Sequence, residues 1–313
     1  MKIRIGYELI YDIPQPTPMI LMLSVHETRR QDLLIADPPQ LDPPIPFKAY
    51  RDHFGNCCQR FVAPQGRLSL STDALINDSG QPDRMVPEAQ QVPLELLPDE
   101  TLLFLLGSRY CETDCLSNIA WRLFGTSPQG WGRVQAICDF VHGHLRFGYE
   151  HANSMKTAWQ AYQEGSGVCR DFAHLAVTFC RCMNIPARYC TGYLGDIGIP
   201  PHDAPMDFSG WFEAYLDGHW YTFDARHNTP RIGRVLIARG RDAADVPITH
   251  SFGQNVLAGF KVVTDEWNDD PTALTGSDLT GSGVAISDDG NGGSDKNGEA
   301  DAVGDKTREL VIH

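Results

Sequence analysis

The 313-residue sequence lacks the features of several common protein classes. Its densest apolar stretch, residues 19–25, is far too short to cross a bilayer. Basic residues number 26 against 40 acidic ones, and the formal net charge of −14 disfavours nonspecific binding to nucleic acid or to an anionic membrane. Residues 1–13 alternate apolar and polar side chains instead of forming the apolar stretch of a signal peptide. We therefore expect a cytoplasmic protein that binds neither nucleic acid nor a membrane.

The sequence also lacks the short motifs of nucleotide and metal enzymes. It has no Walker-type phosphate loop, no dinucleotide-binding fingerprint and no His-Glu-x-x-His zinc motif. Cys57, Cys58, Cys111 and Cys115 are not followed by a Cys/His pair at zinc-finger spacing. We expect neither a metal nor a cofactor. Nine cysteines, an odd number in a chain without an export signal, indicate a reducing compartment in which thiols are core residues, metal ligands or nucleophiles.

The composition divides the chain into three parts. Residues 1–95 carry strand patterns, residues 96–266 carry helical periods followed by strands, and residues 267–313 are rich in Gly, Asp and Ser. The last 46 residues hold ten acidic and three basic side chains, which is half of the net charge, and eight glycines. Such a composition cannot bury enough apolar surface to offset its ordering entropy. We predict a disordered acidic tail.

The first part is predicted to be an antiparallel β-sandwich. From Ile3 to Tyr11, apolar and polar side chains alternate with the period of two that is typical of a half-buried strand. Turn sequences separate this strand from further strands expected at 19–25, 48–51, 60–63 and 67–76.

The second part is predicted to place helices before an antiparallel sheet, which is an α+β arrangement. Apolar residues at helical spacing indicate two amphipathic helices, and aromatic-rich strands follow them. Asp217-Gly218 favours a two-residue type I′ hairpin between the last two strands. The expected elements are helices over 134–145 and 169–184, and strands over 187–194, 211–216 and 220–224.

Cys169 lies at a position that favours a reactive thiol. A glycine-rich turn at 165–167 leads into the second predicted helix, and Cys169 lies at the junction. Unpaired backbone N–H groups and the positive end of the helix dipole stabilise a thiolate at such a position, and the thiolate is the nucleophile. The alternative is a small buried apolar residue, which is what most intracellular cysteines are.

The surrounding blocks of sequence resemble the bacterial transglutaminase-like family over about residues 130–230. The matching blocks are Gly-Val-Cys-Arg-Asp-Phe-Ala-His-Leu at 167–175, Asn-Ile-Pro-Ala-Arg-Tyr at 184–189, Thr-Gly-Tyr at 191–193, Trp-Phe-Glu-Ala-Tyr-Leu at 211–216 and Trp-Tyr-Thr-Phe-Asp-Ala-Arg-His-Asn at 220–228. The preceding β region resembles the N-terminal domain of bacterial members. The resemblance implies a papain-like core with a Cys–His–Asp triad, in which Cys169 is the nucleophile and Asp224 the acid that orients the histidine.

The sequence departs from the family pattern at the histidine. Family members carry His two residues before the residue that aligns with Trp211, and this chain has Ser209 there. If Leu216 pairs with His219 across the hairpin, residue 209 is a same-face diagonal neighbour of Asp224, about 7 Å away. A histidine at position 209 would meet that carboxylate, whereas a serine hydroxyl cannot act as a base near neutral pH.

Three possibilities follow for the missing base. His227 supplies the imidazole if a bulge or a strand end at 225–226 turns it toward Asp224, and we favour this possibility. His202 lies in a Pro-rich loop that could fold over the site. Otherwise the protein is a degenerate relative that binds without turnover. His174 is a poorer candidate, because five residues along a helix place it about 140° around from Cys169.

With a competent base, the Cys169 thiolate would attack an amide carbonyl and form an acyl-enzyme. The backbone N–H of Cys169 and the side chain of Trp159 are candidate donors to the oxyanion, and Ser209 and Trp211 are candidate substrate contacts. Release to water makes a protease or amidase, and release to an amine makes a transglutaminase. We expect a peptide or protein substrate and, as relatives in this family suggest, a ligase-type partner enzyme in a peptide-modifying system. The rival hypothesis is a noncatalytic peptide-binding or assembly module.

Two basic clusters stand out in this acidic chain, at 231–234 and 239–241. They are consistent with a local anion or substrate-carboxylate site, or with a salt-bridged surface, which is the more common role of such clusters.

Overall fold

A computed structural model describes residues 1–200 and 206–268. Residues 1–267 belong to one compact unit, and the description below concerns that unit. The predicted acidic tail falls outside the described residues apart from its first two positions, and so does His202. No helix among the described residues is long and apolar enough to span a bilayer.

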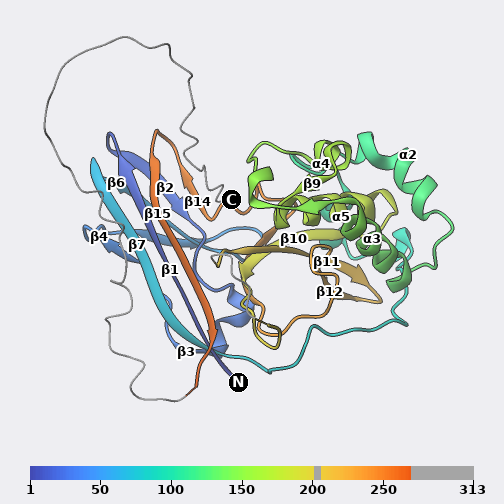
Figure 1. Ribbon diagram of the computed structural model, residues 1–313, viewed down its shortest axis with the longest axis horizontal. Coiled ribbons are helices and arrows are strands. Elements are labelled where there is room, and N and C mark those ends of the chain that lie inside the picture. Colours follow the sequence, from blue (N-terminus) through green and yellow to red (C-terminus); the bar gives the residue numbers. More distant parts are fainter. Residues whose placement is uncertain (201–205, 269–313) are drawn as a thin grey trace, which may run out of the picture. The chain divides into compact units, whose positions relative to one another are not determined.

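The N-terminal region is a sandwich of two antiparallel sheets, as predicted (Figure 1). One sheet has the order β15-β1-β7-β3, with β4 also paired to β7, and the other has the order β14-β2-β6-β5. The alternation along β1 buries Ile3, Ile5 and Leu9 completely. The strands are β1 (Lys2–Ile13), β2 (Thr17–Leu21), β3 (Leu33–Ile35), β4 (Gln40–Asp42), β5 (Lys48–Arg51), β6 (Cys57–Ala63), β7 (Gly66–Asn77), β14 (Thr249–Ser251) and β15 (Val256–Glu266).

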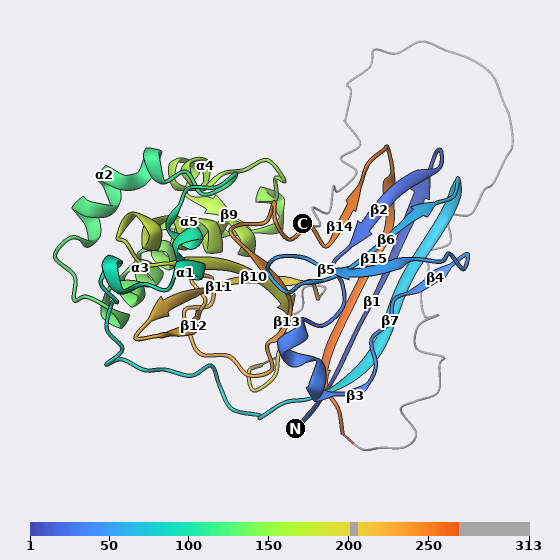
Figure 2. The ribbon, with the colours of Figure 1, turned by 180° about the vertical axis from the view of Figure 1, so that it is seen from behind.

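The last two strands return to the beginning of the chain. Residues 249–266 fall within the range predicted for the core, yet β14 pairs with β2 and β15 pairs with β1 from Ile3 to Asp12. The sandwich is therefore completed by residues that follow the core in sequence (Figure 2). Pairing between strands about 250 residues apart leaves no local sequence signal, which is why the sequence reading did not find it.

The second region packs helices on one side of a four-stranded antiparallel sheet of order β12-β11-β10-β13, which we call the core sheet (Figures 1 and 2). Its strands are β10 (Ala187–Tyr193), β11 (Ser209–Leu216), β12 (His219–Phe223) and β13 (Val235–Gly240). The helices are α1 (Asp99–Leu102), α2 (Thr113–Phe124), α3 (Trp131–His144), α4 (Ala158–Glu164) and α5 (Cys169–Cys182). Short parallel strands β8 (Arg146–Phe147) and β9 (Ser166–Gly167) lie between them, and 3₁₀ turns cover Glu27–Asp32, Leu94–Leu96, Leu103–Leu105 and Tyr149–His151.

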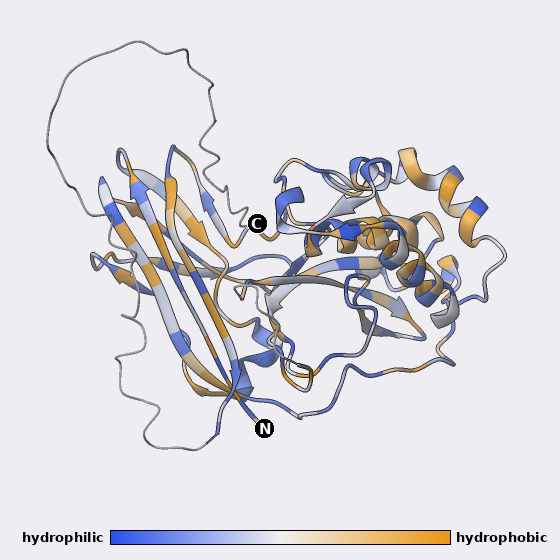
Figure 3. Cartoon of the chain, viewed as in Figure 1, coloured by the Kyte–Doolittle hydropathy of each residue, from blue (hydrophilic) through white to orange (hydrophobic). Residues whose placement is uncertain are grey.

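Helix α5 is the centre of this region. It packs against β10 and β11 on one side and against α2, α3 and α4 on the other. Every residue from Arg170 to Cys182 is buried, so the helix is enclosed on all faces rather than along the single predicted stripe. Apolar residues accordingly concentrate on α5, whereas they alternate with polar ones along the sandwich strands (Figure 3).

The hairpin β11–β12 has the predicted geometry. Asp217 and Gly218 both have positive φ, 48° and 80°, as a type I′ turn requires, and Leu216 pairs with His219. The register therefore places Phe212 opposite Phe223, one residue before Asp224.

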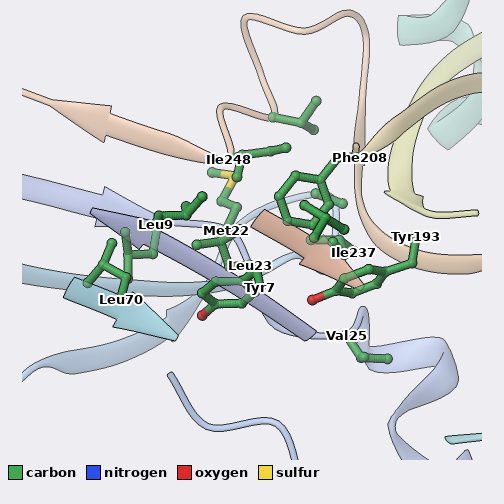
Figure 4. Packing of buried hydrophobic residues seen from close by; sticks show 14 of the residues in the cluster. Tyr7, Leu9, Met22, Leu23, Val25, Leu70, Tyr193, Phe208, Ile237 and Ile248 are labelled. Carbon is green, nitrogen blue, oxygen red and sulfur yellow. The ribbon is translucent and has the colours of Figure 1, made fainter. Parts of the chain in front are cut away.

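The sandwich and the core sheet share one hydrophobic cluster. Tyr7 of β1 lies 6.3 Å from Phe208, and Phe208 lies 5.3 Å from Tyr193 of β10, measured between ring centroids. Figure 4 shows these rings together with Ile237 of β13 and Leu9 of β1. Phe208 immediately precedes β11, so the strand that faces the start of α5 is anchored in this shared core.

Candidate active site around Cys169

The chain reverses sharply to place Cys169 at the first position of α5. Gly165 ends α4 in the left-handed conformation, with φ of 62°, a conformation that favours glycine. Val168 is extended and caps α5, and the Asp171 carboxylate accepts the backbone N–H of Val168 at 2.9 Å. Cys169 is partly exposed, whereas the residues on both sides of it are buried. Cys169 is thus a partly exposed residue at the helix N-terminus.

The start of β11 lies directly against this turn. The backbone N–H of Gly210 acts on the Cys169 thiol and favours a lower pKa. A Cβ at Gly210 would lie 2.8 Å from the Tyr189 hydroxyl and 3.4 Å from the Arg170 Cα, so the close approach requires glycine. The start of β11 and the start of α5 are therefore in close contact.

The environment of the thiol favours its protonated form. Burial raises the pKa of Cys169 to about 11, and Asp207 and Asp171 add to the rise, while the Arg226 charge and the Gly210 N–H act in the opposite direction. The sequence reading expected the helix dipole to stabilise a resting thiolate, and desolvation outweighs that effect here. A thiol with this pKa must lose its proton to a base during the attack.

Both carboxylate oxygens of Asp224 accept hydrogen bonds. Strand β12 ends at Phe223, and the following turn directs the N–H groups of Arg226 and His227 to one carboxylate oxygen at 3.0 Å each. The other oxygen accepts His227 Nδ1 at 2.8 Å and Arg234 Nη2 at 2.8 Å. Burial opposes ionisation, but the Arg234 guanidinium and His227 hold the pKa of Asp224 well below its usual range. The strand end that His227 needed to reach Asp224 is present.

Arg234 and Trp211 form the support behind this carboxylate. Arg234 is buried and also pairs with Asp83 at 2.8 Å, and its guanidinium lies 5.2 Å from the Trp211 ring centroid. Arg231 of the same cluster is buried and contacts the Gly195 carbonyl at 2.8 Å. Two roles were predicted for residues 231–234, an anion site or a salt-bridged surface. The contacts in the structure are ion pairs, but these ion pairs are buried instead of lying on the surface. Trp211 is buried in this packing.

Ser209 begins β11, opposite Gly192 of β10. Its carbonyl accepts the Thr191 hydroxyl at 3.2 Å. Its own hydroxyl is buried and has no hydrogen-bond partner among the described residues. Where family members carry an imidazole, this chain therefore has a small hydroxyl that makes no polar contact with the described part of the chain.

Two other predicted or weighed residues lie elsewhere. Trp159 stacks on Tyr162 at 6.0 Å and donates its backbone N–H to Glu112, and no contact within the described chain joins it to Cys169. His174 accepts the Ala243 N–H at Nε2 and stacks on Tyr110, which is a packing role. Geometry therefore gives no support to Trp159 as an oxyanion donor.

The sequence reading missed two charged neighbours of the thiol, Arg226 and Asp207. Burial raises the pKa of Asp207 to about 6, although the Phe208 N–H and Arg226 favour its ionised form. Both had a signal in the sequence: Arg226 lies between the two residues predicted to act as acid and base, and Asp207 lies two residues before Ser209, the spacing at which strand residues share a face.

A cysteine at the N-terminus of a buried helix, packed against an antiparallel sheet whose edge strand ends in an Asp–His pair, defines a papain-like α+β core. Residues 118–225 match the model of the transglutaminase-like superfamily. The crystal structure of a putative cysteine protease from Cytophaga hutchinsonii is 31% identical, with a TM-score of 0.74, over 86% of this chain and 92% of that one. The chain therefore belongs to the transglutaminase-like superfamily, as its motifs predicted.

An uncharacterized protein of Mycobacterium leprae is also similar. It is 33% identical over 93 residues, which is 28% of this chain and 32% of the relative's length. The match thus spans about a third of that curated relative.

Proposed function

We propose that this protein is a thiol enzyme that acts on peptide or isopeptide amide bonds through an acyl-enzyme on Cys169. The observation that supports this most strongly is the position of Cys169, a partly exposed residue that begins α5 beside the closely packed start of β11. Of the other eight cysteines, seven are buried and Cys115 is exposed on α2. Similarity to a protein described as a cysteine protease points the same way.

In the proposed mechanism, His227 is the base and Asp224 sets its tautomer. An ionised carboxylate accepts hydrogen bonds only, so Nδ1 of His227 carries the proton in the Asp224 contact and Nε2 of the neutral ring is an acceptor. The Cys169 proton moves to Nε2 as sulfur bonds to the carbonyl carbon, and the carbonyl electron pair moves to oxygen. When the carbonyl reforms, the C–N bond breaks and the leaving amine takes the proton. Water or an amine then attacks the thioester carbon and gives a proton to Nε2, and as the C–S bond breaks the Cys169 sulfur takes that proton.

A second candidate function is peptide binding without turnover, and Ser209 favours it. The position that carries the family's histidine has a hydroxyl without a hydrogen-bond partner among the described residues. In this alternative, the Asp224–His227–Arg234 network only shapes the fold, and the protein acts as an assembly module.

The test measures covalent chemistry at Cys169 directly. The full chain is incubated with a defined peptide mixture, and acyl adducts and cleaved or transamidated products are quantified by mass spectrometry. Cys169→Ala abolishes all products, whereas Cys115→Ala, which removes the exposed thiol, changes nothing. His227→Ala and, separately, His202→Ala are compared with His219→Ala, an exposed imidazole on the same hairpin. No product with the wild-type protein, together with retained peptide affinity in the Cys169→Ala variant, would establish the binding function instead.

We also propose a reducing, cytoplasmic location and a peptide or protein substrate presented by a ligase-type partner. All nine cysteines are unpaired, which suits a reducing compartment. Photo-crosslinking with the Cys169→Ala variant in cells would capture substrate and partner, and recovery of exported proteins alone would contradict the proposed location.

A further inference from the structure

Arg226 lies in the turn between Asp224 and His227, and both its backbone N–H and its backbone carbonyl form hydrogen bonds. Its N–H donates to Asp224 at 3.0 Å, and its carbonyl accepts Nδ1 of His142, on α3, at 2.9 Å. The direction in which its side chain leaves the turn is therefore set by the same contacts that hold Asp224.

The guanidinium lies on an aromatic platform beside the cysteine turn. Its Cζ is 3.7 Å from the centroid of the Phe147 ring. Phe147 is in register with Gly167 of β9, two residues before Cys169, and its ring lies 6.4 Å from Phe172 in the first turn of α5. The pairing of β8 with β9 and the contacts of the Phe147 ring thus place the Arg226 guanidinium close to the start of α5.

The charge of Arg226 is available to a ligand. No carboxylate within the described ranges lies within 4.0 Å of it, unlike Arg188 and Arg234, which are paired at 2.5 and 2.8 Å. Its charge acts on the Tyr149 hydroxyl and on the Asp207 carboxyl, and in both cases it favours the ionised form. The same charge acts on Cys169, whose pKa burial raises and Arg226 lowers.

We propose that Arg226 is a catalytic residue whose guanidinium N–H groups stabilise the negative charge that forms at the reacting centre. That charge is first on the Cys169 sulfur as its proton leaves, and then on the carbonyl oxygen of the tetrahedral intermediate. The guanidinium keeps its proton throughout and only donates hydrogen bonds, so the bond changes of the proposed mechanism are unaltered. The inference rests on the proposed function and adds a donor to the oxyanion role predicted for the Cys169 N–H and Trp159.

The competing explanation is that Arg226 only clips the turn to Phe147 through a cation–π contact. Such a contact needs no anion at the site. Only the proposed role requires a positive charge that attracts an anionic reagent to the Cys169 sulfur. The rate of reaction with such a reagent therefore tests the proposal without depending on turnover.

The experiment compares alkylation of Cys169 by iodoacetate and iodoacetamide, with the Cys169 peptide quantified by mass spectrometry in the full chain. A guanidinium beside the sulfur attracts the carboxylate reagent, so Arg226→Gln lowers the iodoacetate-to-iodoacetamide rate ratio by about tenfold, the effect of losing one charge-assisted hydrogen bond. Arg226→Lys retains most of the ratio. Arg109→Gln is the matched control, because Arg109 stacks on Tyr110 at 4.9 Å and is exposed.

A ratio in Arg226→Gln equal to that of the wild type, with only a lower melting temperature, would overturn the proposal in favour of the structural clip. Amide turnover is measured in parallel, and its kcat falls by about 10²–10³ in Arg226→Gln with partial recovery in Arg226→Lys. Absence of turnover in the wild type with a changed alkylation ratio would contradict the proposed function while retaining the anion site. If Arg226→Gln does not fold, the salt dependence of the wild-type ratio decides, because salt screens the attraction of iodoacetate to a guanidinium; a ratio that does not fall with added salt would overturn the proposal.

Discussion

Polar groups of Arg226, His227 and Arg234 are organised around the Asp224 carboxylate. Asp224 is buried and accepts four hydrogen bonds, two of them from His227 and one from Arg234. Taking a carboxylate out of water is costly, and the buried guanidinium offsets that cost. The pair therefore holds the turn that presents both Arg226 and His227.

Breaking this pair from one side leaves an uncompensated buried charge. We expect Asp224→Asn to lower the free energy of unfolding by about 3–5 kcal/mol, and Arg234→Met to have a similar effect. Because the folded pKa of Asp224 lies below its ordinary value of 3.8, its contribution is present above about pH 4 and is lost as pH falls. Urea denaturation at pH 7 measures both variants. In the double variant the losses should be less than additive, and full additivity would mean that the two side chains do not interact.

Asp207 has the opposite dependence on pH. Burial raises its pKa to about 6 from 3.8, so between these values the folded protein keeps a proton that the unfolded chain has lost. Its stabilising contribution is complete below about pH 4 and disappears as pH rises to about 6. Relative to that of Asp207→Asn, which does not titrate, the free energy of unfolding of the wild type should fall by up to about 3 kcal/mol over this range. Denaturation of both proteins from pH 4 to 7 measures the difference, and a constant difference would show that the carboxyl is not buried as described.

At the scale of elements, the close approach of β10 and β13 depends on one glycine. A Cβ at Gly192 would overlap the Val235 carbonyl oxygen and lie 3.0 Å from both the Ile237 nitrogen and the Trp211 ring. Backbone atoms held in a sheet cannot move aside without loss of the ladder. The position thus joins the core sheet to the Trp211 support of Asp224.

We expect Gly192→Ala to destabilise the protein by at least about 1–3 kcal/mol, as overpacking of a filled interior does. Gly143→Ala is the control, since a Cβ there meets no atom within 4 Å and an exposed helical Gly→Ala change stabilises by about 0.5–1 kcal/mol. Thermal unfolding of the two variants should move in opposite directions. An unchanged melting temperature for Gly192→Ala would mean that β13 can separate from β10.

The elements themselves were largely predictable where the signal is local. Strand β5 has the predicted bounds, helix α5 begins at Cys169 as predicted, and the Asp217-Gly218 turn has the predicted type. Strand β2 is shorter than the predicted 19–25 because it ends at Leu21. The apolar residues that follow, Met22, Leu23 and Val25, are buried without strand pairing, since a run of apolar residues records burial and not hydrogen bonding.

At the scale of the whole molecule, the sandwich and the core sheet are not independent. Phe208 belongs to a cluster with Tyr7 and Tyr193, and it is joined through the chain to Asp207 and to the start of β11. Shared apolar burial couples the stability of the two regions. The sandwich therefore supports the strand that contacts Cys169.

Phe208→Ala should lower the free energy of unfolding by about 3–5 kcal/mol and leave a single cooperative transition. Phe252→Ala, which changes a ring that is 61% exposed, is the control and should have little effect. Far-ultraviolet circular dichroism and the denaturant dependence of Cys169 alkylation are followed together. Two separate transitions in the wild type would show that the sandwich and core unfold independently.

The sequence by itself determined the class of the fold, the nucleophile candidate at the start of a helix and the loss of the usual histidine, because these follow from local periodicity and from motif spacing. It also identified the condition under which His227 could reach Asp224, which is a strand end. Only the tertiary structure decided that β15 completes the first sheet, that Arg234 and Trp211 support Asp224, and that the charges of Arg226 and Asp207 act on the thiol. These contacts join residues far apart in the chain, or depend on which face a turn presents, and the burial that raises the pKa of Cys169 arises from all of them together.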